Sequence, residues 1–254
     1  MTYTHGHQEP VLRSHRWRTA ENSCAYLLPH LRADMTLLDV GCGPGSITAD
    51  LADRVGRVVG VDRSPEAVAA ARADHPGIDF RVADLHDLDE HFDVVHAHQV
   101  LQHLQDPVAA LARLASLARL VAVRDSDYPG FLWHPADERL DRWRETYLAV
   151  TRRNGANADA GRRLPAWAHE AGLTDITFST STWTFADPDD RGWWGQLWAE
   201  RTEATTFADQ AVAYGVATPG ELAEMAEGWK AWAAEPDGVF VVVHGELLAR
   251  PPAA

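Results

Sequence analysis

The stretch LLDVGCGPG, from Leu37 to Gly45, joins an apolar run to the start of an amphipathic helix. Glycines at positions 41, 43 and 45 allow the backbone to turn tightly and to approach a ligand closely. The free amides of the helix that begins at Ser46 lie behind this turn. A strand, a glycine-rich turn and a helix in this order predict a cofactor site at the first turn of an α/β fold.

An acidic residue follows the next predicted strand, where VVGVDRS places Asp62. A carboxylate at that point can accept hydrogen bonds from both hydroxyls of a ribose. A dinucleotide site prefers the spacing G-x-G-x-x-G, which would require a third glycine at position 46, but Ser46 stands there. The spacing here is G-x-G-x-G. An ordinary tight turn beside a surface acid is the alternative interpretation of these residues.

Outward from this turn, the first half of the chain alternates short apolar runs with helical patterns, which is typical of a parallel sheet built from βαβ units. The second half contains nine of the ten tryptophans and carries mostly helical patterns. The predicted strands are 36–40, 58–61, 78–82, 92–97, 120–124, 175–185 and 239–248. The predicted helices are 46–55, two that start at Ser64 and Asp106, 136–153, 162–171, 193–214 and 219–234.

The glycine spacing resembles motif I of the class I S-adenosylmethionine-dependent methyltransferases. The segment VADLHDL, 82–88, is similar to the third-strand motif of that family. The segment FDVVHAHQVLQHLQDP, 92–107, resembles the fourth-strand motif of its ubiquinone and menaquinone methyltransferase-like group. The resemblance is good from about position 12 to position 124. RDSDYPG and the final HGELLAR are similar to a subset of small-molecule methyltransferases, but are less diagnostic.

The resemblance implies a Rossmann-like, mostly parallel sheet of seven strands with an antiparallel last strand, helices on both faces and a small helical cap. It implies one domain over 1–254, with cap elements at about 1–30, 128–163 and 190–235. It also implies S-adenosylmethionine as the cofactor, with Asp84 on the adenine amino group and Leu85 against the ring. The cofactor-binding residues expected are Gly41, Cys42, Gly43, Asp62, Arg63, Asp84, Leu85, His98 and Gln99. A solvated loop acid is the alternative for Asp84.

One segment departs from the family pattern. The family usually has a basic-Pro-Gly-Gly turn between the fourth helix and the fifth strand, whereas this chain reads LASLARLVAV, 114–123. The connection must therefore be shorter than usual, and either the helix or the strand gives up residues.

Two residues near strand ends are candidates for a catalytic base, His103 and Asp125. Ligands bind at the carboxyl edge of such sheets, and His103 matches a position that faces the methyl-transfer centre in relatives. Histidine can take a proton from a hydroxyl or an amine. A helix-capping histidine and a turn acid are equally weighted alternatives.

Other candidates concern the acceptor. Trp133, Trp193, Trp194 and Trp198 form either an aromatic pocket or ordinary helix packing. The histidines His5, His7 and His15 lie in an N-terminal segment that folds over the cofactor in relatives, or are simply surface residues. His96 and His98 are expected to alternate at the end of a strand, so that only one of them faces the pocket.

Composition excludes several classes of protein. The net charge is −14 and Lys230 is the only lysine, which argues against nucleic-acid binding. No apolar run is long enough to span a membrane, and positions 1–10 lack a signal-peptide core, so a cytoplasmic location is expected. Cys24 and Cys42 fit neither a disulfide framework nor a metal site, so no metal is expected. An oligomer is possible but not indicated.

The sequence therefore predicts methyl transfer to a small molecule of secondary metabolism, with an aromatic or polyketide-like hydroxyl as the favoured acceptor. The alternatives are an N- or C-methyltransferase of a small metabolite, a non-catalytic protein that binds S-adenosylmethionine, and a nicotinamide-dependent oxidoreductase. Ser46 and the segment around Asp84 count against the last of these.

Overall fold

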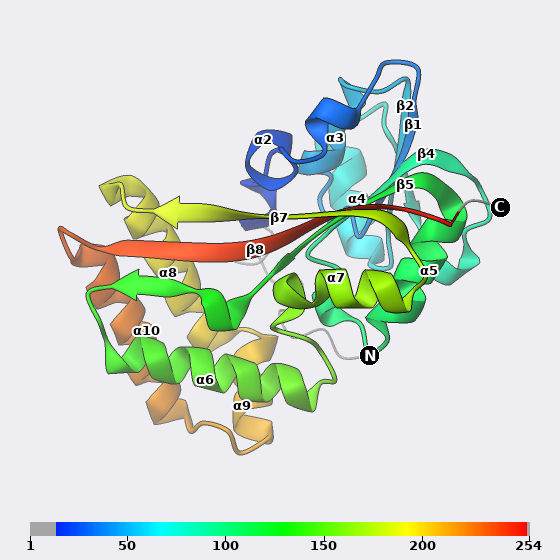
Figure 1. The fold of residues 1–254 in the computed structure, drawn as a ribbon. Coiled ribbons are helices and arrows are strands. Elements are labelled where there is room, and N and C mark those ends of the chain that lie inside the picture. The colour runs from blue at the N-terminus through cyan, green and yellow to red at the C-terminus, as the bar shows by residue number, and fades with distance from the viewer. Residues whose placement is uncertain (1–13, 253–254) are drawn as a thin grey trace.

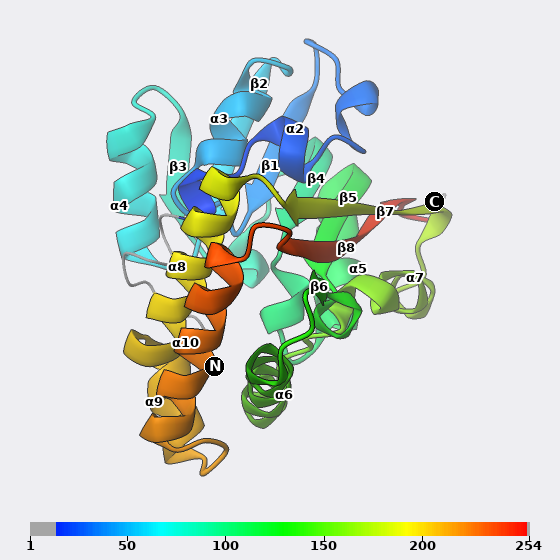
Figure 2. The same ribbon diagram turned by 90° about the vertical axis from the view of Figure 1, so that its left-hand side faces the viewer.

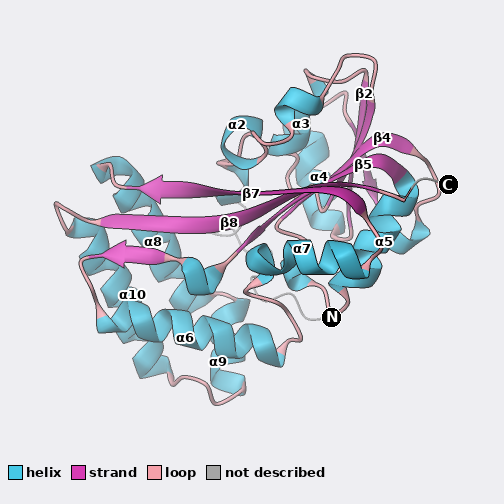
Figure 3. Cartoon of the chain, in the orientation of Figure 1, coloured by secondary structure: helices cyan, strands magenta, loops and turns pink. Residues whose placement is uncertain are grey.

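The computed structural model describes residues 14–252, and an eight-stranded sheet forms its centre (Figures 1 and 3). His5 and His7 lie outside the described residues. Along the sheet the order is β3-β2-β1-β4-β5-β8-β6, and β7 also pairs with β8. The predicted α/β class is confirmed, with one more strand than predicted.

Five parallel strands build the half of the sheet that carries the glycine turn. Their pairing is parallel throughout, and their apolar side chains alternate between two helical layers. One layer contains α2 and α3, and the other contains α5 and α7. These strands are β1 (Thr36–Val40), β2 (Arg57–Asp62), β3 (Asp79–Val82), β4 (Phe92–His98) and β5 (Ala118–Ser126). The helices are α2 (Ala20–Ser23), α3 (Ser46–Ala52), α4 (Pro65–Asp74), α5 (Pro107–Leu117) and α7 (Ala160–Glu170).

The last strand, β8 (Val239–Arg250), is antiparallel to every strand that it pairs with. The long strand β7 (Thr174–Phe185) follows one of its edges from end to end. Its other edge pairs first with β6 (Leu132–His134) and then with β5. The sequence did not predict β6, because three residues are too few to show an alternating pattern. β6 is thus the one strand that the structure adds to the seven predicted ones.

Four helices pack beside the extension of the sheet formed by β6, β7 and β8 (Figure 2). They are α6 (Glu138–Arg153), α8 (Pro188–Ala204), α9 (Thr206–Ala213) and α10 (Pro219–Ala234). Their shared core is rich in aromatic rings, and Trp17 of the N-terminal segment packs against it. The assignment of one domain with cap elements at about 1–30, 128–163 and 190–235 stays a prediction.

The single helix predicted over 193–214 is wrong in its bounds and its continuity. It begins earlier, at Pro188, and is interrupted at Thr205, whose extended backbone separates α8 from α9. The helix predicted over 46–55 also stops early, at Ala52. Short 3₁₀ helices complete the chain: η1 (Leu28–His30), η2 (Leu85–Asp87), η3 (Leu101–His103) and η4 (Tyr128–Gly130).

The shortened connection before the fifth strand has a simple form. Helix α5 ends at Leu117, and Ala118 already has the extended backbone of β5 (φ −150°, ψ 162°). The strand thus begins two residues before the predicted position 120. No residue is left for a turn. The absence of the Pro-Gly-Gly sequence therefore makes the connection shorter, and the order of the strands is unchanged.

Candidate functional site

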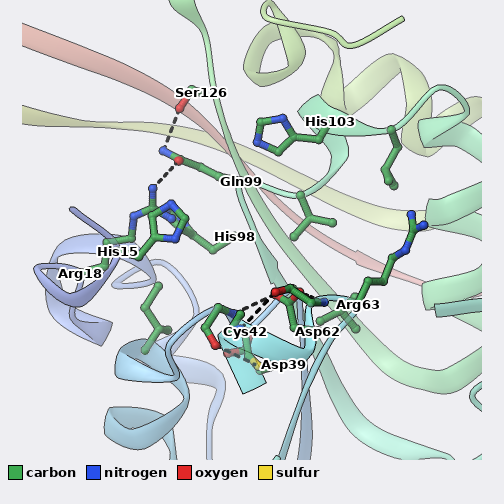
Figure 4. A pocket seen from close by; sticks show the side chains of 18 of the residues that line it. His15, Arg18, Asp39, Cys42, Asp62, Arg63, His98, Gln99, His103 and Ser126 are labelled. Carbon is green, nitrogen blue, oxygen red and sulfur yellow. Dashed lines mark hydrogen bonds between the residues drawn. The ribbon is translucent and has the colours of Figure 1, made fainter. Parts of the chain in front are cut away.

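A cavity of about 770 Å³ lies at the carboxyl ends of β1, β2, β4 and β5 (Figure 4). One end of the cavity is formed by the glycine turn, by Asp62 at the end of β2 and by Asp84 after β3. The other end is formed by aromatic side chains that lie between the sheet and the cap helices. All nine predicted cofactor-binding residues line it, together with His103.

The glycine turn is held open toward the cavity. Gly41 and Gly43 have positive φ values of +71° and +56°, which favour glycine. A Cβ atom on Gly41 would lie 2.5 Å from a methyl group of Val100, whereas a Cβ on Gly43 would meet only the ring of His15, at 3.6 Å. The turn therefore needs glycine at position 41 for packing, and at position 43 it presents bare backbone to the cavity.

The Asp62 carboxylate is fixed by two backbone amides. One oxygen accepts a hydrogen bond from Gly43 N at 3.0 Å and the other from Ser64 N at 2.9 Å. These bonds orient the carboxylate at the end of β2, and each oxygen keeps a second lone pair for a ligand. The geometry is that expected for a group that accepts two adjacent hydroxyls.

Below the turn, Asp39 of β1 is buried and bonded on both sides. It accepts a hydrogen bond from the Thr48 hydroxyl at 2.5 Å, and its other oxygen lies 2.8 Å from Nδ1 of His96. This places His96 beneath the turn, whereas His98 lines the cavity. Only one of the two histidines lines the pocket, as predicted, but the predicted alternation is wrong. Residues two apart on a strand share a face, and the rings of His96 and His98 are stacked with centroids 6.5 Å apart, so His96 is excluded by its depth beneath the turn.

Asp84 and Arg63 lie side by side at the far end of the cavity. Asp84 caps η2 by accepting a hydrogen bond from His86 N at 3.0 Å, and its other oxygen is 3.1 Å from Nε of Arg63. Leu85 follows on the same wall. The acid is thus anchored, and Arg63 lies in the open rim with its side chain mostly exposed.

Gln99 links three segments that are far apart in the sequence. Its amide nitrogen donates to Ser126 Oγ at 2.8 Å and lies 2.9 Å from Nε2 of His244, while its oxygen accepts from Arg18 at 2.8 Å (Figure 4). Its backbone has a φ of +54°, a conformation that costs an ordinary residue about 1–3 kcal/mol. The surrounding bonds hold Gln99 in this strained conformation.

The histidines around Gln99 are neutral. Burial lowers the pKa of His98 and of His244 well below the usual value, and the nearby charges of Arg18 and Arg124 lower it further. Since Gln99 donates to Nε2 of His244, the proton of that ring belongs on Nδ1. These rings therefore act as polar but uncharged parts of the cavity wall.

His103 lies on η3 in the cavity wall, as predicted. Burial lowers its pKa to about 3, and the charge of Arg18 adds to this effect. Its Nε2 is 3.1 Å from the side-chain amide of Gln102. The imidazole is therefore neutral throughout the physiological range and presents a weakly basic ring to the cavity.

Asp125 is not among the residues that line the cavity. It is fully buried on the opposite face of β5 from Ser126 and accepts a hydrogen bond from Gln102 N at 3.2 Å. Burial raises its pKa to about 8. The structure thus separates the two predicted bases: His103 faces the cavity, and Asp125 supports the turn that carries His103.

The aromatic end of the cavity is lined by rings that the sequence analysis identified only in part. Trp194 and Trp198 of α8 line the cavity, as considered above, but Trp133 and Trp193 do not. The remaining lining residues there are Tyr128, Phe131, Trp183, Arg201 and Val242. No local pattern marks Trp183 or Arg18 as site residues, because they arrive from an edge strand and from the N-terminal segment.

The described part of the chain offers no metal site. No group of three His, Cys, Asp or Glu side chains within residues 14–252 could hold a metal ion. Cys42 lines the cavity, and burial raises the pKa of its thiol, so it remains a small uncharged packing residue. None of the helices in the same range combines the length and apolarity needed to cross a bilayer.

Comparison with known proteins agrees with this geometry. The profile of the methyltransferase domain family matches residues 38–119. An uncharacterized methyltransferase of Schizosaccharomyces pombe is 31% identical over 98% of this chain and 96% of its own length. A ubiquinone biosynthesis O-methyltransferase of Rhodopseudomonas palustris is 34% identical over 38% of this chain and 43% of its own length.

Solved structures share the fold at low sequence identity. The phosphoethanolamine N-methyltransferase 2 of Haemonchus contortus, in complex with S-adenosylhomocysteine, has a TM-score of 0.53 and 17% identity. The match covers 88% of this chain and half of that longer protein. Because the relationship to the yeast protein spans nearly the full length of both chains, the chain belongs to the class I S-adenosylmethionine-dependent methyltransferases.

Proposed function

We propose that this protein transfers the methyl group of S-adenosylmethionine to a hydroxyl oxygen of a small aromatic or polyketide-like acceptor. One observation carries the proposal: a single cavity joins the glycine turn and Asp62 to a wall of aromatic rings. Its volume of about 770 Å³ is in the upper part of the range for ligand pockets, which is room for a cofactor and a second small molecule.

The residues at the glycine turn fit the cofactor. The bare backbone at Gly43 faces the cavity, where the methionine end would lie, and the oriented Asp62 carboxylate suits the ribose hydroxyls. Asp84 is anchored where it can accept a bond from the adenine amino group, beside Leu85. We assign Cys42, Arg63, His98 and Gln99 to the same binding site on their place in the cavity wall.

The cofactor supplies an activated methyl group with its own leaving group. The protein has to align the acceptor oxygen with that methyl group and exclude water, which favours reaction chiefly through proximity and orientation. The buried rings of Trp194 and Trp198 supply a flat, dry surface for an aromatic acceptor. This step needs no metal and no covalent intermediate on the enzyme.

The acceptor hydroxyl must lose its proton during the transfer. His103 is the proposed base, because its neutral ring lies in the cavity wall. Its Nε2 would exchange the contact with the Gln102 amide for the acceptor hydroxyl. With a pKa of about 3 it would hold the proton only while the oxygen–carbon bond forms, and would then release it to solvent. We do not propose Asp125 as a base, since it lies outside the cavity.

Binding of the cofactor is the first test. Calorimetric titration with S-adenosylhomocysteine should show binding, titration with NAD should show none, and Asp62→Ala should abolish the first signal. Binding of NAD in place of S-adenosylhomocysteine would support an oxidoreductase. If the folded protein bound neither compound, the proposal of an active methyltransferase would fail.

The acceptor is tested separately. Methyl-labelled S-adenosylmethionine should yield labelled products with a panel of phenols and hydroxylated polyketides, and His103→Ala should slow their formation. Label transferred only to amines or to carbon would replace the oxygen acceptor with one of the two alternatives. Cofactor binding with no transfer to any compound would favour a non-catalytic binding protein.

A further inference from the structure

Two of the edge strands of the sheet, β3 and β7, differ in how they are protected. β3 at one edge has only four residues, and two of these, Asp79 and Arg81, are charged and bonded to each other. Short length and charge are the usual means of keeping an exposed edge from pairing with another chain. β7 has twelve residues and a single ionisable one, Asp175.

The outer side of β7 is open. Its only strand partner is β8, and no backbone hydrogen bond from another part of residues 14–252 reaches its outer side (Figure 3). Most side chains from Thr174 to Thr182 are exposed on both faces of the strand, and Phe178 is 41% exposed. This edge presents a long row of backbone donors and acceptors, which is a template for an added strand.

The charge of the chain restricts which partner fits this edge. With a net charge of −14, two copies repel each other over most of their surfaces. From Ile176 to Phe185 the strand carries no ionisable side chain, and its residues are mainly Thr, Ser and aromatic. Two copies of β7 would therefore meet without placing like charges opposite each other, and such residues favour strand pairing.

We propose that β7 is a dimerisation edge, at which a second copy of the chain adds its own β7 in antiparallel orientation. The two sheets then form one continuous sheet around a two-fold axis. Directly opposite residues on adjacent strands point to the same face of the sheet. Under the two-fold axis one residue of β7 must therefore lie directly opposite the same residue of the second copy.

A register centred on Thr180 lies within the regular part of the edge, which begins at Thr177 after a β-bulge. It pairs residues 177–183 of both copies and places Phe178 opposite Thr182 of the second copy, an aromatic and β-branched pair that stabilises sheets. Asp175, whose backbone has a φ of +48°, lies in the bulge outside the paired stretch. Thr180 itself faces its own counterpart across the axis.

The test uses this self-contact of Thr180. Sedimentation velocity of the full chain should give a species of twice the 28.0 kDa mass. Because Thr180 is exposed in the single chain, Thr180→Lys and Thr180→Glu should leave the fold intact, as circular dichroism would verify. Each variant alone should shift to the monomer mass, and an equimolar mixture should recover the dimer because opposite charges then meet at the axis.

A charge on the other edge provides the matched control. Val82 of β3 is also exposed, so Val82→Lys adds the same charge to a strand that makes no proposed contact and should leave the dimer unchanged. A wild-type protein that stays monomeric at high concentration would overturn the proposal. So would a dimer that persists in both Thr180 variants, or one that the mixture does not restore.

Discussion

The backbone amide of Gly43 donates a hydrogen bond to the Asp62 carboxylate at 3.0 Å. This bond joins the glycine turn after β1 to the acid at the end of β2, so that the two halves of the proposed cofactor site form one unit. Any change to the carboxylate is therefore expected to alter the turn as well as the direct contact with the ribose.

The two effects are separable at Asp62. Asp62→Asn keeps an oxygen that can accept from Gly43, whereas Asp62→Ala removes every acceptor. Loss of charge-assisted hydrogen bonds costs about 1.5–3 kcal/mol each, so we expect S-adenosylhomocysteine to bind Asp62→Asn at least tenfold more weakly. Binding to Asp62→Ala should be weaker still. Equal affinities in calorimetry for the wild type and Asp62→Ala would refute the assignment.

Gln99 is expected to hold the N-terminal segment on the cavity. Gln99→Ala removes its bonds to Arg18 and Ser126, and we expect faster hydrogen exchange at the amides of residues 14–19, with a stability loss of about 1–3 kcal/mol. Gln105→Ala, an exposed residue at the rim, is the control. Unchanged exchange in that segment would show that Gln99 does not fasten it.

Asp125 should make stability depend on pH. In the unfolded chain its proton is released near pH 4, but in the folded protein burial raises its pKa to about 8. Between these values the folded state binds more protons than the unfolded state, so this residue lowers the stability progressively as the pH rises from 4 to 8.

The isosteric variant Asp125→Asn cannot titrate. The free energy of unfolding of this variant, relative to that of the wild type, should therefore rise between pH 5 and pH 9 by on the order of a few kcal/mol. Thermal melts of both proteins over this pH range would show the rise as a growing difference in melting temperature. A difference between the two proteins that stays constant over this range would mean that Asp125 does not carry the proton.

The rate of methyl transfer should show no histidine-like rise near neutral pH. Because the pKa of His103 is about 3, the ring is already neutral at pH 5, and its protonation limits the rate only in stronger acid. His103→Ala should lower kcat by about a hundredfold or more if it acts as a base. The exposed His91→Ala is the control, and an unchanged kcat in His103→Ala would exclude the catalytic role.

Trp194 is expected to affect the acceptor alone. Trp194→Phe narrows the flat surface at the acceptor end, so the KM for an aromatic acceptor should rise about tenfold while the affinity for S-adenosylhomocysteine stays the same. Trp133→Phe changes a ring that packs on Phe240 away from the cavity, and should alter neither value. A loss of cofactor affinity in Trp194→Phe would place this ring at the other end.

The parallel half of the fold could be predicted because its signals are local. The glycine turn, the strand-ending Asp62 and the caps at Ser64 and Asp106 each depend on a few consecutive residues. The face of a strand is different. Asp125 and Ser126 are neighbours on β5, both polar, and nothing in the sequence shows which of them faces the cavity, because a shift of one residue exchanges the two faces.

The remaining site residues arrive through long-range packing. Arg18 binds Gln99, which is 81 positions away in the sequence. Trp183 comes from an edge strand, and its indole nitrogen donates a hydrogen bond to Asn22 O. Such contacts depend on how separate elements meet in three dimensions. The aromatic composition of the second half indicated a buried cluster, but not which of its rings border the cavity.

The pairing of β8 along both of its edges sets an order in which the molecule can be assembled. This strand follows all the others in the chain, yet β5, β6 and β7 all pair with it. During synthesis the five parallel strands can form their sheet early, whereas the aromatic end of the cavity must wait until β8 leaves the ribosome. In the interval β5 has an open edge, and the tryptophans of α6 and α8 are exposed, so this is the stage at which the nascent chain most needs protection from aggregation.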